Sequence, residues 1–152
     1  MDGNLNHRKI LLVEDNPDDV ELTMRAFKKN AILNDIVVVR DGAEALDYFF
    51  GPKGCASRGH PNLPAVVLLD LKLPKVDGIE VLRRIRAHEH TKLVPVVILT
   101  SSKDQKDVLN GYNLGCNSYV RKPVDFNQFI EAARQLGLYW LMLNELPAES
   151  GR

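Results

Sequence analysis

Two hydrophobic patterns alternate along the chain. Short apolar runs rich in valine, isoleucine and leucine predict buried β-strands, and the longer segments between them carry apolar residues at helical spacing. Strands are predicted at 9–14, 36–39, 65–69, 96–99 and 118–121. Helices are predicted at 17–30, 42–50, 79–89, 103–114 and from about 125 onward. Such alternation is typical of βαβ units, so we expect an α/β fold: a parallel five-stranded sheet between helices, a three-layer αβα sandwich.

Local signals set the limits of the first predicted helix. Pro17 suits the first helical position, with Asp15 or Asn16 as the N-cap, and acidic residues in the first turn favour the helix dipole. The inward face of this helix is predicted to carry Val20, Met24, Phe27 and Ala31.

The segment 51–64 is predicted to be a long loop, because glycine, proline and polar residues dominate it. Loops of this length are uncommon in compact domains, which indicates an insertion with its own use or with mobility. Cys55 is expected to lie in this loop and Cys116 in or near the core, and two cysteines alone provide no disulfide framework. Asp77-Gly78 marks another break, where Gly78 is expected to serve a turn.

Composition narrows the function classes. The 152 residues fit one domain, and 20 basic residues balance 20 acidic ones, which argues against a broad nucleic-acid-binding surface. We interpret the cluster of Arg83, Arg84 and Arg86 as the solvated face of a helix. No apolar run reaches the ~18 residues that span a bilayer, and the N-terminus lacks the features of a signal peptide. We therefore predict a cytoplasmic protein that does not enter a membrane.

Polar residues follow four of the apolar runs directly. Glu14 and Asp15 follow the first strand, Asp70 the third, Thr100 the fourth and Lys122 the fifth. The carboxyl ends of parallel strands meet at one edge of the sheet, where open α/β folds bind their ligands. Three carboxylates held close together are unfavourable unless a cation neutralises them, and oxygen ligands suit Mg²⁺. The sequence therefore predicts a site for a divalent cation and a phosphoryl group.

Taken in order, these motifs resemble those of CheY-like receiver domains of two-component response regulators. The motifs are Val13-Glu14-Asp15-Asn16, Leu69-Asp70-Leu71-Lys72-Leu73-Pro74, Asp77-Gly78, Leu99-Thr100-Ser101 and Tyr119-Val120-Arg121-Lys122-Pro123. The resemblance covers residues 9–136, and the spacings of 30 residues from Asp70 to Thr100 and 52 to Lys122 are similar to the family's. It implies a flavodoxin-like sheet of strand order 2-1-3-4-5.

A narrower resemblance is to the stand-alone regulators of bacterial phytochrome histidine kinases. They share the Glu-Asp-Asn-Pro-x-Asp opening, a long loop before the third strand and an extended last helix. This resemblance implies a single-domain response regulator, with a core at about 8–136, a last helix that extends to about 146, and no output domain. Its partner would be a sensor histidine kinase, in this case a bacteriophytochrome.

The resemblance also implies the cation ligands and the phosphoacceptor. Asp70 would be the nucleophile that takes a phosphoryl group from a phosphohistidine. Mg²⁺ would be bound directly by Asp15 and Asp70, through water by Glu14, and by the backbone carbonyl of Lys72. The domain would catalyse its own phosphorylation and dephosphorylation rather than turn over an external substrate.

Three further residues would bind the phosphoryl group or report its presence. Lys122 and the hydroxyl of Thr100 would each bind a phosphoryl oxygen, and a cis Lys122–Pro123 bond would aim the lysine into the site. Phosphorylation would draw Thr100 inward, and the ring of Tyr119 would turn from exposed to buried. The surface of the fourth helix, fifth strand and fifth helix would change with it.

The end of the chain carries a second informative pattern. The stretch 136–143 is apolar on every side of a helix, and such a helix needs cover on all sides. We expect a homodimer through this helix, with contacts from Leu136, Tyr139, Trp140 and Leu143. Alternatives are a tail that folds back on the domain and a contact with the kinase.

Two other functions fit an aspartyl phosphate or this fold. A phosphatase of the haloacid-dehalogenase type needs a second acid two residues after its nucleophile, where this chain has Lys72. A pseudo-receiver would use the same fold as a pure interaction module, and the presence of Asp15, Asp70, Thr100 and Lys122 argues against it.

Overall fold

The computed structural model describes residues 8–30, 32, 34–57, 63–100, 115, 118–122 and 126–135. Five parallel strands form one sheet in the order β2-β1-β3-β4-β5. The strands are β1 (Ile10–Val13), β2 (Ile36–Val39), β3 (Val66–Asp70), β4 (Val96–Thr100) and β5 (Ser118–Arg121). The helices are α1 (Pro17–Lys29), α2 (Gly42–Phe50), α3 (Gly78–Ala87) and α5 (Phe126–Gln135). The predicted flavodoxin-like order is confirmed.

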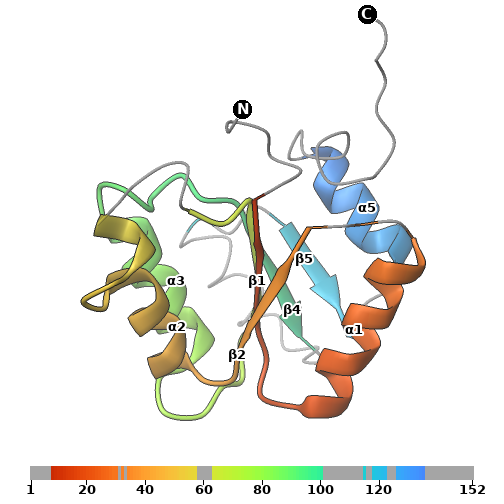
Figure 1. Ribbon diagram of the computed structural model, residues 1–152, viewed down its shortest axis with the longest axis horizontal. Helices are drawn as coiled ribbons and strands as arrows, with labels where there is room; N and C mark the ends of the chain where they lie inside the picture. Colours follow the sequence, from red (N-terminus) through yellow and green to blue (C-terminus); the bar gives the residue numbers. More distant parts are fainter. Residues whose placement is uncertain are drawn as a thin grey trace, which may run out of the picture.

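The helices cover both faces of the sheet and create two separate hydrophobic clusters. Figure 1 shows α1 and α5 on one side of the sheet and α2 and α3 on the other. Successive residues of β1 alternate between the clusters, so Ile10 and Leu12 pack with α1 and α5, and Leu11 and Val13 with α2 and α3. A central strand that is buried on both faces explains why its sequence is a continuous apolar run.

Caps fix where three of the helices begin. The Asn16 side chain accepts hydrogen bonds from the backbone N–H groups of Asp18 and Asp19, which makes Asn16, rather than Asp15, the N-cap of α1. Asp41 and Asp77 cap α2 and α3 in the same way. These caps sit at the carboxyl edge of the sheet, so each helix starts beside the polar strand ends.

The inward face of α1 differs from the predicted one. Val20 and Phe27 are buried as expected, but Met24 is 40% exposed and Thr23 is 4% exposed. At 100° per residue, positions 20, 23 and 27 lie within about 60° of one another, and position 24 lies beyond that arc. The prediction for Met24 was wrong because it assigned the inward face from apolar side chains alone. The polar residue Thr23 lies nearer the centre of that face and is buried in its place.

The described residues after α2, 51–57, pack against the core. A short 3₁₀ helix, η2 (Cys55–Ser57), buries Cys55 in the cluster under α2 and α3, so the prediction of Cys55 as a plain loop residue was wrong. The His90 ring nitrogen Nδ1 lies 2.6 Å from the carbonyl oxygen of Ala56 and ties this segment to the region after α3. Residues 55–57 therefore pack as part of the domain.

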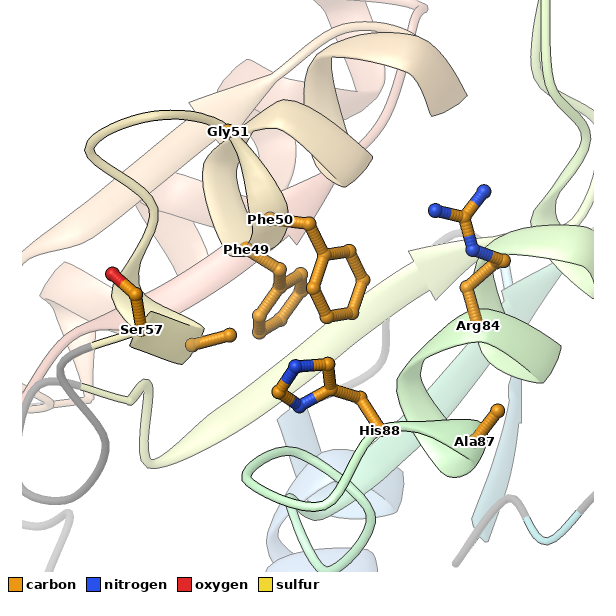
Figure 2. A pocket seen from close by; sticks show the side chains of 8 residues that line it. Phe49, Phe50, Gly51, Ser57, Arg84, Ala87 and His88 are labelled. Atoms are coloured by element: carbon orange, nitrogen blue, oxygen red, sulfur yellow. The ribbon is translucent and has the colours of Figure 1, made fainter.

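A cavity of about 400 Å³ lies where this insertion meets the ends of α2 and α3. Figure 2 shows the rings of Phe49 and Phe50 directed toward His88, with Arg84 beyond Phe50 and Ser57 on the other side. The Phe50 and His88 ring centroids are 5.2 Å apart. The two phenylalanines lie at the carboxyl end of α2, and Arg84 and His88 lie at that of α3. The polar strand ends lie beside the amino ends of the same helices.

One member of the predicted arginine cluster is structural. The Arg86 guanidinium donates hydrogen bonds to the carbonyl oxygens of Gly115, Lys92 and Val94, at 2.8, 3.1 and 2.7 Å. Arg83 and Arg84 are exposed, as predicted for a solvated face. The prediction was wrong for Arg86, which binds three carbonyls after α3 and before β5.

Several predictions fall outside the described residues. They are Ala31, residues 58–62 of the predicted loop, the helix at 103–114, Cys116, the Lys122–Pro123 bond and the apolar stretch with Leu136, Tyr139, Trp140 and Leu143. Within the described part of the chain, none of the helices has both the length and the apolar character that crossing a membrane requires.

Candidate functional site

Three strands deliver polar groups to one point of the carboxyl edge. β1 and β3 pair Val13 with Leu69, so Glu14 and Asp70 follow at neighbouring positions. The exposed fractions of these residues are only 1% for Glu14 and 4% for Asp70. Lys122 follows β5, two strands away from β3. The structure therefore brings together residues that the sequence separates by up to 108 positions.

The ammonium group of Lys122 is surrounded by carboxylates. Its Nζ donates to Glu14 Oε1 at 2.8 Å, to Asp70 Oδ2 at 2.9 Å and to Asp19 Oδ2 at 3.0 Å. A lysine ammonium has three N–H donors, so these three bonds use all of them. The side chain is only 12% exposed, which limits the screening of these ion pairs by solvent.

Asp19 was not predicted as a site residue. The sequence places it in the first turn of α1, where an acid is already explained by the helix dipole. Asp15 precedes the N-cap Asn16, so the four-residue spacing from Asp15 to Asp19 places no two side chains on one helix face, and no sequence signal indicated the contact with Lys122.

Three carboxylates form a cluster suited to a hard cation. Glu14, Asp15 and Asp70 each offer one oxygen, and these oxygens lie within 4.8 Å of one another. Two oxygens that both coordinate Mg²⁺ at about 2.1 Å lie about 3–4 Å apart, so this spread accommodates two direct ligands and a third through water. Asp15 is exposed and Glu14 and Asp70 are buried, so the cluster opens to solvent at Asp15. The residues present fit a small divalent cation.

The two oxygens of Asp70 have different partners. Oδ1 accepts a hydrogen bond from the backbone N–H of Lys72 at 3.1 Å, and Oδ2 accepts from the ammonium of Lys122. The carboxylate is therefore held in a fixed orientation at the end of its strand. A cavity of about 410 Å³ adjoins the cluster and is lined by Asp15, the loop after β3, Asp77 and Ile79.

Burial and neighbouring charge set the protonation of the site. Burial, together with the nearby charge of Asp70, raises the pKa of Glu14 to about 7, although hydrogen bonds from Lys122 and Asn16 act in the opposite direction. Burial alone would lower the pKa of Lys122, but its hydrogen bonds to Glu14, Asp70 and Asp19 raise that pKa above the usual value. Lys122 is therefore charged, and Glu14 titrates near neutral pH.

The model of one protein family matches the chain from residue 10 to residue 134. That family is the response regulator receiver domain. The chain belongs to this family. Receiver domains act in two-component signalling, with a histidine kinase as partner, and they bind a divalent metal.

Individual relatives of this receiver domain support the assignment. A curated relative, the probable methanogenesis regulatory protein FilR2 of Methanothrix harundinacea, is 43% identical over 138 residues, which cover 91% of this chain and 86% of that one. The solved structure of the bacteriophytochrome response regulator AtBRR is 52% identical, with a TM-score of 0.78, and covers 91% of this chain and 99% of its own.

A third relative has been solved with a metal. The Mn²⁺-bound form of response regulator Rcp1 is 35% identical, with a TM-score of 0.69, and covers 93% of this chain and 99% of its own. Rcp1 comes from Synechocystis sp.. The acidic cluster of this receiver domain fits the same class of ligand.

The remaining predicted residues occupy the surroundings of the site. Thr100 ends β4 and pairs with Arg121 of β5, and its side chain lies outside the described part. Tyr119 is half-buried against the cluster under α2 and α3. Lys72 is exposed and contributes its backbone N–H to Asp70, and the predicted role of its carbonyl stays a prediction.

Steric contact requires glycine at position 78, in addition to the predicted role in a turn. Gly78 is the first residue of α3, and its N–H donates to the carbonyl of Leu71 at 2.9 Å. A Cβ at this position would lie 2.3 Å from the carbonyl oxygen of Asp70. Glycine is therefore needed because α3 begins in contact with the backbone of the proposed phosphoacceptor.

Proposed function

We propose that this receiver domain accepts a phosphoryl group on Asp70 from the phosphohistidine of a histidine kinase, with Mg²⁺ as cofactor. The observation that carries the proposal is the setting of Asp70: a buried carboxylate between an ammonium group and two further carboxylates at a strand end. A carboxylate in this position is a nucleophile next to a cation site, and its orientation is fixed by the N–H of Lys72.

The transfer is an in-line displacement at phosphorus. A carboxylate oxygen of Asp70 forms the new P–O bond while the P–N bond to the donor imidazole breaks, and the electron pair and then a proton go to that nitrogen. The product is an aspartyl phosphate, a mixed anhydride. Attack by water on phosphorus later restores the carboxylate and releases inorganic phosphate, which makes the signal self-limiting.

The lysine supplies positive charge where the phosphoryl group carries negative charge. In the unphosphorylated molecule its ammonium binds Glu14 and Asp70, and on transfer it exchanges bonds to these carboxylates for bonds to a phosphoryl oxygen. We assign a second oxygen to the hydroxyl of Thr100, whose strand ends beside β3. Repacking of Thr100 and Tyr119 would then alter the surface around β5, which is how the domain would signal.

The cation ligands proposed are Asp15 and Asp70 directly, Glu14 through water, and the backbone carbonyl of Lys72. When bound, Mg²⁺ neutralises the carboxylates and withdraws charge from a phosphoryl oxygen. The residues of the chain supply the geometry, since two of the three acids are buried and only Asp15 faces solvent.

For the partner, we propose a sensor kinase of the bacteriophytochrome class. The support is the 52% identity to AtBRR, which is named as a bacteriophytochrome response regulator. The identity to FilR2, a probable methanogenesis regulator, is lower, at 43%. A phosphotransfer assay with purified phytochrome and non-phytochrome kinases tests this, and preferential transfer from the latter would overturn it.

We also propose a homodimer through the apolar stretch 136–143, with contacts from Leu136, Tyr139, Trp140 and Leu143. The support is the sequence pattern, because one small domain cannot cover a helix that is apolar on every side. Trp140→Ala should convert the protein to a monomer in size-exclusion chromatography with light scattering. A constant mass across a wide concentration range in both proteins would contradict the proposal.

Phosphorylation itself is tested with a small donor. The protein is incubated with acetyl phosphate and Mg²⁺ and its intact mass is measured by mass spectrometry. One phosphoryl adduct is expected in the parent protein, and none in Asp70→Asn. Asp47→Asn, which removes an exposed acid of α2, should label like the parent protein. An adduct that survives Asp70→Asn would overturn the assignment of Asp70.

A further inference from the structure

The contact between Asp19 and Lys122 has no place in the proposed roles of the site. Asp19 Oδ2 accepts a hydrogen bond from Lys122 Nζ at 3.0 Å, and its side chain is 28% exposed. We propose that Asp19 is a positioning residue, which retains the Lys122 ammonium at the cleft when a cation and a phosphoryl group take its other partners. The inference rests on the proposed phosphorylation of Asp70 and adds a residue to it.

The partners of Lys122 differ in what else they do. Glu14 and Asp70 belong to the group of carboxylates that could hold a cation, and Asp19 does not. A cation that binds these carboxylates competes with the ammonium for their oxygens and repels it. Two of the three bonds that hold Lys122 are therefore exposed to this competition, and the bond to Asp19 is not.

The N-cap of α1 fixes the position of Asp19 beside Lys122. Asn16 Oδ1 accepts hydrogen bonds from the N–H of Asp18 at 2.8 Å and of Asp19 at 3.3 Å, which fixes the first turn of α1. Asp19 comes from a helix, and Glu14 and Asp70 come from strand ends. The lysine is thus held from a third side, by a carboxylate that lies outside the group that could bind a cation.

A retained ammonium accelerates transfer because its position is set before the phosphoryl group arrives. Lysine has four flexible side-chain bonds, and holding its end in place removes an entropic cost from the transition state. Without Asp19, an ammonium displaced by the cation would move toward solvent. It would then have to be ordered again during phosphoryl transfer, which slows the reaction.

Asp18 offers a matched control for this inference. It is the neighbouring residue, it has the same charge and lies in the same turn, but it is exposed and no contact with Lys122 is found for it among the described residues. Any effect of helix dipole or of overall charge should appear in both Asp18→Asn and Asp19→Asn. An effect that depends on the position of Lys122 should appear only in Asp19→Asn.

The experiment measures the rate of labelling by acetyl phosphate at saturating Mg²⁺, with the intact mass as readout. Asp19→Asn should slow labelling on the order of tenfold, the effect of one charge-assisted hydrogen bond, and Asp18→Asn should change it less than about twofold. In a Lys122→Ala background, Asp19→Asn should slow the residual labelling less than about twofold further, because the group that it positions is gone.

The outcomes separate the two proposals. Labelling of the parent protein, with equal rates in Asp18→Asn and Asp19→Asn or with an unchanged effect of Asp19→Asn in the Lys122→Ala background, would overturn the role of Asp19 alone. Absence of labelling on Asp70 in the parent protein would overturn the proposed function and the role of Asp19 with it. Urea unfolding of each variant shows whether a slow rate reflects misfolding.

Discussion

Lys122 Nζ lies 2.9 Å from Asp70 Oδ2, although the two residues are 52 positions apart and their strands, β3 and β5, are separated in the sheet by β4. The contact depends on the strand order, because β4 stands between β3 and β5 and Lys122 must reach across its end. It also depends on charge, since the same ammonium neutralises Glu14 and Asp19. In the absence of a metal ion, the lysine is thus the internal counter-ion of the site.

Removing this counter-ion should destabilise the metal-free protein. Lys122→Ala leaves Glu14 and Asp70 buried without a positive partner, so we expect the free energy of unfolding to fall by about 2–4 kcal/mol. Saturating Mg²⁺ should restore part of the loss, because a divalent cation also neutralises these acids. Urea unfolding followed by circular dichroism measures both effects.

Lys92→Ala serves as the control for that measurement. Lys92 pairs with Glu89 at 3.6 Å, with side chains that are 50% and 80% exposed, so its loss should change the unfolding free energy by less than about 0.5 kcal/mol. Equal losses in Lys92→Ala and Lys122→Ala would show that the carboxylates need no internal counter-ion.

The affinity for Mg²⁺ should rise with pH because of Glu14. Burial raises the pKa of this carboxyl to about 7, and its neutral form is a poor partner for a cation. Below about pH 7, the dissociation constant measured by calorimetry should increase with falling pH, up to roughly tenfold per pH unit. In Glu14→Gln the affinity should be weak and nearly independent of pH over this range. A parent protein with a flat profile would rule out Glu14 as the titrating group.

The same pKa has the opposite consequence for the stability of the metal-free protein. A carboxyl whose pKa is higher in the folded than in the unfolded state stabilises the fold while it is protonated. Its contribution is fully present below its ordinary pKa of 4.5 and is lost as the pH rises through about 7. The difference in unfolding free energy between the parent protein and Glu14→Gln should therefore change across this window, on the order of 2–3 kcal/mol. A constant difference from pH 4.5 to pH 7.5 would contradict it.

The positions of the strands and the meeting of their polar ends were accessible from the sequence for one physical reason. A parallel sheet that is buried on both faces needs continuous apolar runs, and these runs are easy to recognise. Because parallel strands all end at the same edge of the sheet, the residues that directly follow them lie close together there. Glu14, Asp70 and Lys122 therefore meet. The strand order itself came from the resemblance to receiver domains.

The contacts of Asp19 and Arg86 were not accessible in this way. Both are polar residues on amphipathic helices, where periodicity separates buried from exposed faces but does not identify a polar partner. Arg86 binds carbonyls 6 to 29 residues away, and Asp19 binds an amine 103 residues away. Such bonds depend on side-chain direction after folding, which no local pattern encodes.

Gly78 provides a test of close packing behind the acceptor. Alanine is usually favoured over glycine in a helix by roughly 0.5–1 kcal/mol, so Gly78→Ala would stabilise the protein if space were available. A Cβ there would lie 2.3 Å from the carbonyl oxygen of Asp70, and backbone cannot rotate away as a side chain can. We expect a loss of about 2–3 kcal/mol in urea unfolding and slower labelling by acetyl phosphate.

Asp77→Ala is the reference variant for the loss of unfolding free energy expected in Gly78→Ala. It removes the N-cap bond to the N–H of Glu80 without adding an atom, and should cost about 1 kcal/mol. A Gly78→Ala variant as stable as the parent protein would show that α3 can withdraw from Asp70 at little cost.

Arg86 and Arg84 are a matched pair on the last turn of α3. Arg86 donates to three carbonyls, and Arg84 is exposed with its guanidinium carbon 5.7 Å from the Phe50 ring centre. Arg86→Ala leaves carbonyls of the 92–94 segment and Gly115 without a charged donor, so we expect a loss of about 2–3 kcal/mol in urea unfolding. Arg84→Ala should cost less than about 1 kcal/mol, the value of an exposed cation–π contact. If both variants unfolded at the same urea concentration, the bonds of Arg86 would contribute no more to stability than the surface contact of Arg84.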